Sequence, residues 1–214
     1  MHDLKINHVD IKIYVMSQSD SILDLARHQR VLSAADVRGH GWSPQLLLSL
    51  YQAGKLQRVA RGLYSLPDVE PTEHQAALEV CQRVPKAVLC LLSALQFHQV
   101  GTQMPHELWI ALPEATPTPV LDYPALRIAR LRGAAYSEGI QTVVEYGAPI
   151  RVYSVAKTVT DCFKFRHKIG LDVALEALKD AWRTRKLSMQ EVSYFAKINR
   201  VERVMQPYLE AVVA

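Results

Sequence analysis

The sequence contains little cysteine: there are three in 214 residues, and Cys81, Cys90 and Cys162 show no CxxC spacing. An odd number of widely spaced cysteines argues against a disulfide framework and against a zinc site, and favours buried thiols. No apolar run reaches the roughly 18 residues that a transmembrane helix requires. Residues 1–16 alternate between polar and apolar, unlike a signal peptide. We therefore expect a cytoplasmic protein without membrane association.

The sequence also lacks the motifs of common enzyme classes. It contains no HExxH, GxSxG, GxGxxG or P-loop pattern. A nuclease-like metal site would need an Asp and a Glu-x-Lys on adjacent strands. Asp122 lies in a proline-rich stretch, however, and Glu145 is followed by Tyr and Gly. We therefore predict a protein that is not an enzyme and that uses no metal or cofactor, and a DNA-processing enzyme is the least favoured alternative.

Acidic residues are absent from one continuous stretch, Val37 to Pro67, which nevertheless contains four Lys and Arg residues. The whole chain has a formal net charge of +4 and a pI near 9.0. This balance permits nucleic-acid binding without requiring it. The acid-free stretch is therefore the first place to look for a DNA-binding surface.

Helix-start signals recur before and within this stretch. Ser17 and Ser33 each stand at the start of a segment with helical periodicity, and the second of these is stopped by Gly39 and Gly41. Ser43 is predicted to cap a third helix, with Pro44 in its first position and Gly54 at its end.

Two short strands, Leu56–Ala60 and Leu63–Leu66, are predicted to follow, joined by a tight Arg61–Gly62 turn in which glycine permits a positive φ. Three helices followed by a two-stranded hairpin is the element order of a winged helix-turn-helix.

The predicted third helix has two unlike faces. At about 100° per residue, one face carries apolar side chains and the other carries polar ones. The apolar set is Leu46, Leu47, Leu50 and Ala53, and the polar set is Gln45, Ser49 and Gln52. Glutamine can bond adenine with both amide atoms, and serine can bond several bases. The alternative interpretation is an ordinary solvated helix face.

Basic and imidazole side chains flank this helix on both sides. Arg61 at the hairpin tip is suited to enter a minor groove or to bind phosphate. The predicted DNA-binding residues are Arg38, His40, Ser43, Gln45, Ser49, Gln52, Lys55, Arg58 and Arg61.

The segment PDVEP, residues 67–71, is predicted to be a linker. We predict a helix over 72–83, a second over 86–100, strands near 107–112, 125–131, 142–147 and 149–154, and then helices to the C-terminus. The predicted fold class is α+β: an N-terminal winged helix-turn-helix and a larger C-terminal α+β domain, which has a small, mostly antiparallel sheet and C-terminal helices. The expected division is an extension over 1–16, the winged helix over 17–67 and the C-terminal domain over 71–214.

The last third of the chain, residues 151–214, carries 12 Lys and Arg against 7 Asp and Glu. A solvated helix surface explains this excess most simply, and a second basic face that grips phosphates is the alternative. The residues concerned are Lys157, Lys164, Arg166, Lys168, Lys179, Arg183, Arg185 and Lys186. Lys157 and Asp161 have the i, i+4 spacing of a helical ion pair.

Two runs resemble one known family. VLSAADVRGHGWSPQLLLSLYQAGKLQRVARGLYSL is similar to the N-terminal winged helix of the AbiEi family, the antitoxins of bacterial type IV, or abortive-infection, toxin–antitoxin systems. PIRVYSVAKTVTDCFKFRHKIGLDVALEALKDAW is similar to the C-terminal domain of the same family. The resemblance covers about residues 20–210, whereas residues 1–16 match no pattern of the family.

The resemblance implies a repressor that binds inverted repeats in the promoter of its own operon. It also implies an antitoxin that counteracts a nucleotidyltransferase-like toxin without forming a stable complex, and whose antitoxicity requires the C-terminal domain. Ser43, Gln45 and Ser49 take the places of the family's reading helix, and Arg58 and Arg61 those of its wing. Pairing on an inverted repeat would occur as a dimer or cooperatively on the DNA. The rival interpretation is a winged-helix regulator without a toxin partner.

Overall fold

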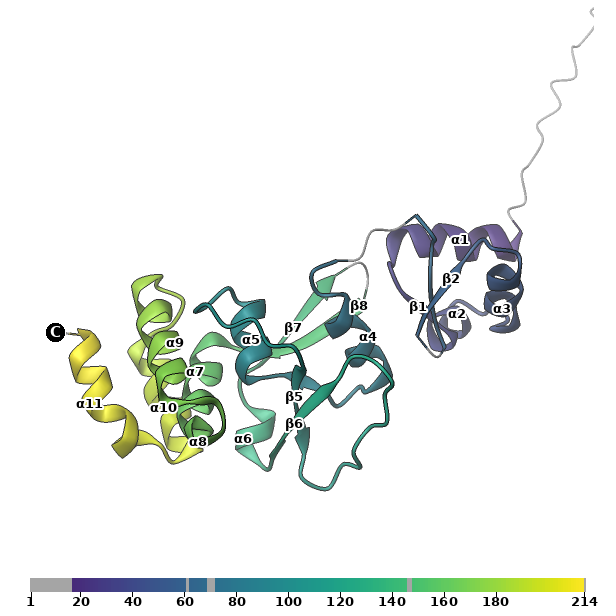
Figure 1. Ribbon diagram of the computed structural model, residues 1–214. Helices are drawn as coiled ribbons and strands as arrows, with labels where there is room; N and C mark the ends of the chain where they lie inside the picture. The colour runs from purple at the N-terminus through teal and green to yellow at the C-terminus, as the bar shows by residue number, and fades with distance from the viewer. Residues whose placement is uncertain (1–16, 61, 69–71, 146–147, 214) are drawn as a thin grey trace, which may run out of the picture.

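The computed structural model describes residues 17–60, 62–68, 72–145 and 148–213, and it shows two parts (Figure 1). A small N-terminal part and a larger C-terminal part each enclose their own buried apolar side chains. The predicted extension over 1–16 and the predicted site residue Arg61 lie outside the described residues. The predicted α+β fold class, with a winged helix-turn-helix before a larger mixed part, is confirmed.

The N-terminal part combines three helices with a three-stranded antiparallel sheet of order β1-β3-β2. The sequence predicted all of these elements except β1, a two-residue strand that pairs with β3. The elements are α1 (Gln18–His28), β1 (Leu32–Ser33), α2 (Ala34–Gly39), α3 (Gln45–Gln52), β2 (Gln57–Ala60) and β3 (Leu63–Ser65).

Side-chain caps fix where the first two helices begin. Ser17 and Asp20 form a capping box at α1, and Ser33 and Asp36 form another at α2. The third helix differs from the prediction, because its N-cap is Pro44 and no side chain caps it. Ser43 therefore does not cap α3; it contributes only its carbonyl, which accepts a hydrogen bond from Leu46 N at 3.1 Å.

The core of the N-terminal part lies where its helices meet. Ile22 and Ala26 of α1 are fully buried, and Leu47 and Leu50 of α3 pack into the same cluster. The predicted apolar face of α3 is thus largely confirmed. Ala53 is the exception: it forms the C-cap of α3 and is exposed to solvent.

The C-terminal part contains a five-stranded sheet of order β6-β5-β4-β8-β7. Its strands are β4 (Val88–Leu89), β5 (Leu108–Pro113), β6 (Leu126–Leu131), β7 (Ile140–Glu145) and β8 (Ala148–Tyr153). The helices are α4 (Gln75–Arg83), α5 (Leu91–Phe97), α6 (Ala134–Ser137), α7 (Val155–Lys164), α8 (Arg166–Ile169), α9 (Leu171–Arg183), α10 (Met189–Asn199) and α11 (Glu202–Val213).

Two details of this sheet differ from the predictions. The sheet is mixed rather than mostly antiparallel, because β5 pairs with β6 and β4 with β8 in parallel, and only the β4–β5 and β7–β8 pairs are antiparallel. The helix predicted over 86–100 is also shorter than expected. Its first residues form the central strand β4, and α5 begins only at Leu91. A continuous apolar run fits a buried strand as well as a buried helix, so its periodicity could not distinguish the two.

Helices cover both faces of the sheet. Leu78 of α4 packs with Ile110, Ile150 and Val152 on one face. The larger core on the other face joins the sheet to α5, α7, α9 and α10, with Phe163 among its fully buried members. In Figure 1 the C-terminal helices form the end of the molecule opposite to the N-terminal part. Within the described ranges, no helix has the length and apolar character needed to cross a membrane.

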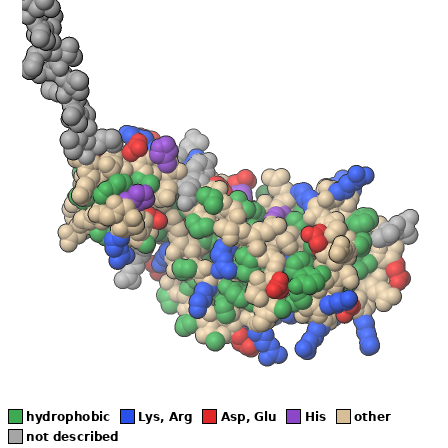
Figure 2. All heavy atoms as spheres, turned by 180° about the vertical axis from the view of Figure 1, so that it is seen from behind, with side chains coloured by type: hydrophobic (Ala, Val, Ile, Leu, Met, Phe, Trp, Pro, Cys, Tyr) green, Lys and Arg blue, Asp and Glu red, His purple; other side chains and the backbone are tan. Residues whose placement is uncertain are grey.

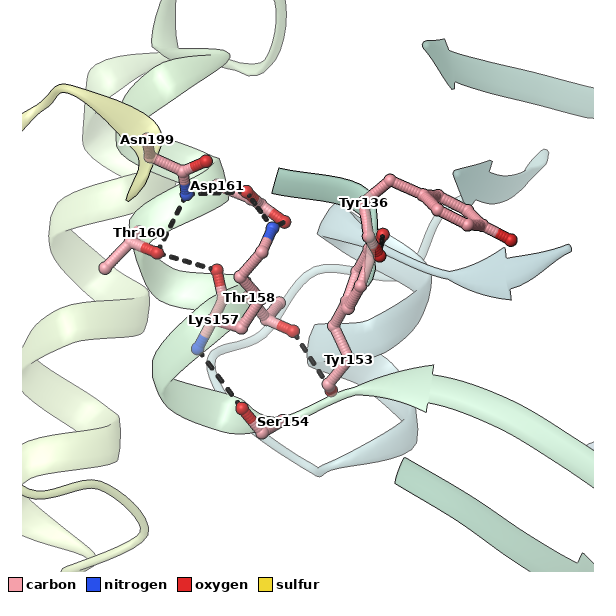
Figure 3. A network of polar contacts seen from close by, with 8 residues as sticks. All are labelled: Tyr136, Tyr153, Ser154, Lys157, Thr158, Thr160, Asp161 and Asn199. Atoms are coloured by element: carbon pink, nitrogen blue, oxygen red, sulfur yellow. Dashed lines mark hydrogen bonds and ion pairs between the residues drawn. The ribbon is translucent and has the colours of Figure 1, made fainter. Parts of the chain in front are cut away.

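A buried ion pair lies at the centre of the C-terminal part (Figure 3). Lys157 Nζ lies 2.6 Å from Asp161 Oδ1 and 2.5 Å from Oδ2, and these side chains are 0% and 1% exposed. The predicted i, i+4 pair is therefore present, but Lys157 does not belong to a solvated basic face as predicted. Asn199 Nδ2 also donates to Asp161 Oδ1, at 2.7 Å. Lys157 Nζ lies 4.3 Å from the centre of the Tyr153 ring.

Replacing one member of this pair should strongly destabilise the protein. In Asp161→Asn the Lys157 ammonium would remain buried without its counter-charge, and we expect a loss of about 3–5 kcal/mol in the free energy of unfolding. Urea denaturation followed by circular dichroism measures this loss. Arg183→Gln, which breaks the exposed ion pair with Asp180, is the control and should cost less than about 1 kcal/mol. Equal effects of the two substitutions would contradict a structural role for the buried pair.

Candidate nucleic-acid interface

The polar face of α3 is open to solvent. Gln45, Ser49 and Gln52 are all exposed, whereas Leu47 and Leu50 on the opposite face are buried. The helix lies on the side of the N-terminal part that is remote from the C-terminal sheet (Figure 1). The stripe predicted from periodicity is thus presented outward without obstruction by the rest of the described chain. The Ser49 hydroxyl donates to Gln45 O at 3.3 Å, and it keeps its lone pairs for an incoming donor.

The end of α2 places two further predicted residues on the surface. Arg38 and His40 are exposed, and the His40 ring stacks on Trp42 with ring centres 4.9 Å apart. Arg38 Nε donates to Ala34 O at 3.0 Å, and His40 Nδ1 lies 3.0 Å from Asp36 O. These contacts restrict both side chains before any partner binds. They leave the remaining guanidinium N–H groups of Arg38 available for a phosphate.

The wing follows α3 directly. Lys55 and Arg58 are exposed, and Arg58 on β2 is paired in register with Tyr64 on β3. Gly62 has a φ of 79°, as predicted for the hairpin turn. Eight of the nine predicted positions are thus exposed to solvent, as contact with DNA requires.

Two exposed apolar side chains on α3 were not among the predicted site residues. Leu48 is 50% exposed and Tyr51 is 42% exposed. The Tyr51 ring lies 6.0 Å from the ring of Tyr64, which connects the helix to the wing. Apolar side chains beside a polar stripe can contact thymine methyl groups. The i, i+3 spacing of the two residues was visible in the sequence, but the polar pattern alone does not select them.

The acidic groups of the N-terminal part are engaged away from the polar stripe. Asp20 and Asp36 close the capping boxes of α1 and α2, and Asp24 pairs with Arg27 at 3.3 Å. The hydrogen bond from the Ser17 side chain lowers the pKa of Asp20 and keeps it ionised. Among the described residues from 37 to 68, the only carboxylate is that of Asp68. An anionic partner approaching α3 therefore meets no repulsion from this stretch.

The C-terminal helices also carry basic side chains on their surface. Figure 2 shows Lys and Arg side chains standing out from the end of the molecule formed by these helices, with hydrophobic and acidic groups between them. Lys168, Lys179, Arg183 and Arg185 are exposed. Lys186 is exposed too, but its ammonium already donates to His98 O and Gln99 O. Lys164 and Arg166 are half-buried. The predicted basic set is thus only partly a solvated face.

The helices, the antiparallel wing and the outward polar stripe define a winged helix-turn-helix, the class of fold that places one helix in the major groove of DNA. Residues 20–67 match the family model described as "Transcriptional regulator, AbiEi antitoxin". This match confirms the resemblance to AbiEi antitoxins over the winged helix. Among curated proteins, none matches the chain in sequence.

A solved structure resembles nearly the whole chain. The crystal structure of the Rv2827c protein from Mycobacterium tuberculosis superimposes with a TM-score of 0.55 at 14% sequence identity. The similarity covers 84% of this chain and 71% of that protein. At this level of identity the likeness shows a shared fold. Because it extends well beyond residues 20–67, the arrangement of the C-terminal part is not peculiar to this chain.

The wing turn should depend on the positive φ of Gly62. A methyl group at Gly62 would meet no atom within 4 Å, so Gly62→Ala tests backbone strain alone. We expect a loss of about 1 kcal/mol in stability and weaker DNA binding, because alanine disfavours this conformation. The matched control is Gly39→Ala in α2, which also meets no atom within 4 Å and has no positive φ. The control should gain about 0.4–1 kcal/mol. Thermal unfolding measures both, and equal shifts would refute the strain argument.

Proposed function

We propose that this protein is an antitoxin that represses its own toxin–antitoxin operon by binding inverted repeats in operator DNA. The N-terminal winged helix binds the DNA, with α3 in the major groove and the wing along the backbone. The observation that carries this proposal is the exposed stripe of Gln45, Ser49 and Gln52, flanked by cations and free of acids. The family match over residues 20–67 supports it independently.

Binding on this surface divides into two kinds of contact. Gln45, Ser49 and Gln52 face base edges and provide sequence preference, whereas Arg38, Lys55 and Arg58 neutralise phosphates. The stripe itself contains no Lys or Arg, so most of the affinity comes from the flanking cations. Two copies bind the two halves of an inverted repeat, as a dimer or cooperatively on the DNA, because one winged helix reads a single half-site.

The antitoxin activity is assigned to the C-terminal part, and its partner is a nucleotidyltransferase-like toxin encoded beside it. The family resemblance of the run from Pro149 to Trp182 supports this assignment. The toxin is counteracted without a stable complex. The protein itself is not an enzyme in this proposal. Within the described residues, no group of three His, Cys, Asp or Glu side chains is placed to hold a metal ion.

The first experiment is binding of the purified protein to its own upstream DNA in the presence of random competitor at near-physiological salt. We expect a preference for the upstream DNA of at least about 10³-fold, in the range of specific binders. Co-expression with the neighbouring gene product, followed by growth measurement, tests the antitoxin role separately. DNA preference without rescue of growth would favour a plain regulator. Metal-dependent degradation of the DNA would overturn the proposal in favour of a DNA-processing enzyme.

Gln45 should discriminate between specific and random DNA. Gln45→Ala removes an amide that bonds a base, so we expect a loss of about 1–3 kcal/mol on the operator and little change on random DNA. Gln141→Ala, at an exposed position on β7, is the matched control and should change neither. Fluorescence anisotropy with both duplexes provides the four affinities. Equal losses on operator and random DNA would make Gln45 a positioning residue.

Lys55 should act through charge alone. Lys55→Ala removes one phosphate contact, so the slope of log K against log salt should become shallower by about 0.9. Binding should weaken equally on specific and random duplexes. Lys179→Ala in α9, an exposed lysine remote from the winged helix, is the control and should leave the slope unchanged. An unaltered slope in Lys55→Ala would remove Lys55 from the interface.

A further inference from the structure

Four cationic side chains from three separate segments surround one hollow in the C-terminal part. Arg130 and Arg132 come from the end of β6 and the residues after it, Lys164 from the last turn of α7, and Arg200 from the C-cap of α10. A single carboxylate, that of Glu114, lies among the lining residues. The hollow is far along the chain from the winged helix.

Three of these cations make no direct ion pair with any described residue. Within the described chain, Arg132, Lys164 and Arg200 take part in no side-chain hydrogen bond or ion pair. Arg130 is held in place by backbone carbonyls instead, since its guanidinium donates to Pro113 O and Thr116 O. Burial lowers the pKa of Lys164 and attraction by Asp161 opposes this, while repulsion from Lys157, Arg132 and Arg200 lowers the pKa further. Mutual repulsion of this kind is relieved by an anion that all of them can reach.

The backbone at Arg200 adds a second, independent observation. Arg200 caps α10 in the left-handed conformation, with φ 58° and ψ 42°. Glycine is the residue that most easily adopts this conformation at a helix end, and a long side chain there is unfavourable. Strained residues of this kind concentrate at functional sites. A role of the guanidinium in binding would explain why arginine occupies this position.

The base and wall of the hollow are suited to more than a bare anion. Leu131, Ala135 and Ile198 provide an apolar wall beside the cations. Asn199 lies at the base and is 5% exposed; its Nδ2 is engaged by Asp161 and Thr160, but its Oδ1 has no hydrogen-bond partner. A ligand that combines phosphates with a flat, partly apolar group is a nucleotide.

We propose that this hollow, named here the α7–α10 basic pocket and formed by Arg130, Arg132, Lys164, Asn199 and Arg200, binds a free nucleoside triphosphate. The phosphates contact the four cations, whose charge is close to that of a triphosphate, and the base or ribose lies against the apolar wall. Arginine and lysine are the usual partners of phosphate oxygens. A concave pocket with an apolar wall suits a small molecule better than a duplex backbone.

Isothermal titration of the full chain with ATP, GTP, CTP and UTP in turn tests this proposal, with adenosine and inorganic tripolyphosphate as partial ligands. We expect at least one nucleotide to bind, tripolyphosphate to bind more weakly, and adenosine not to bind. Absence of heat with all four nucleotides at about 1 mM would overturn the proposal. A dissociation constant above about 1 mM corresponds to little binding free energy. Displacement of the bound nucleotide from the native protein by random duplex DNA would also overturn it.

Arg200→Gly distinguishes binding from folding. The substitution removes the guanidinium and places the favoured residue in a left-handed cap, so the melting temperature should stay the same or rise while nucleotide affinity falls about tenfold or more. Arg185→Gly is the matched control, since Arg185 also has a positive φ, 55°, but lies outside the pocket. It should leave affinity unchanged. Lys164→Met, which keeps the side-chain length, should weaken nucleotide binding in the same way. Native-like affinity in both pocket variants would refute the proposal.

Operator binding supplies an independent readout. Arg200→Gly should bind operator DNA as the native protein does, because the winged helix and the α7–α10 basic pocket belong to different parts of the chain. Failure of the winged-helix proposal would appear as loss of operator preference in the native protein, whatever the nucleotide result.

Discussion

The C-terminal part depends on a charge pair that has been removed from water. Lys157 and Asp161 lie one turn apart on α7, and both would be costly to bury alone. Burial raises the pKa of Asp161, and the ion pair with Lys157 and the hydrogen bond from Asn199 act in the opposite direction. Around this pair the structure brings together the end of β8, the middle of α7 and the end of α10. This arrangement gives both buried charges a partner and joins α10 to α7 through the Asn199 amide.

The same network connects the core to the surface. Asn199 bonds Asp161 on the inside, and the next residue, Arg200, stands at the rim of the α7–α10 basic pocket. Lys164 lies on the same helix as the buried pair, three residues after Asp161. The positions of two pocket cations are therefore set by the interior of the protein and not by flexible loops. A rigid support of this kind is what a binding site needs to hold a ligand in one orientation.

Much of the fold could be predicted from local signals. The helix starts at Ser17 and Ser33, the glycine at the wing turn and the polar stripe of α3 each depend on residues only a few positions apart, so the sequence displays each of them directly. Features that depend on distant contacts could not be predicted. Strand β1 exists only because β3 pairs with it, and the apolar run near Val88 becomes a strand only because its neighbours in the sheet are strands. The burial of Lys157 is likewise decided by α10, which lies about 40 residues further on.

The order of strands in the sheet has a consequence for the synthesis of the chain. The central strand β4 is two residues long and holds the β5–β6 pair to the β8–β7 pair, with Leu89 opposite Val152. Emerging from the ribosome, the winged helix has all of its elements by residue 66. The larger sheet cannot form until β8, the partner of β4, has been synthesised, which requires more than 80 further residues. A nascent chain can therefore present a finished winged helix well before the part that contains the buried ion pair exists.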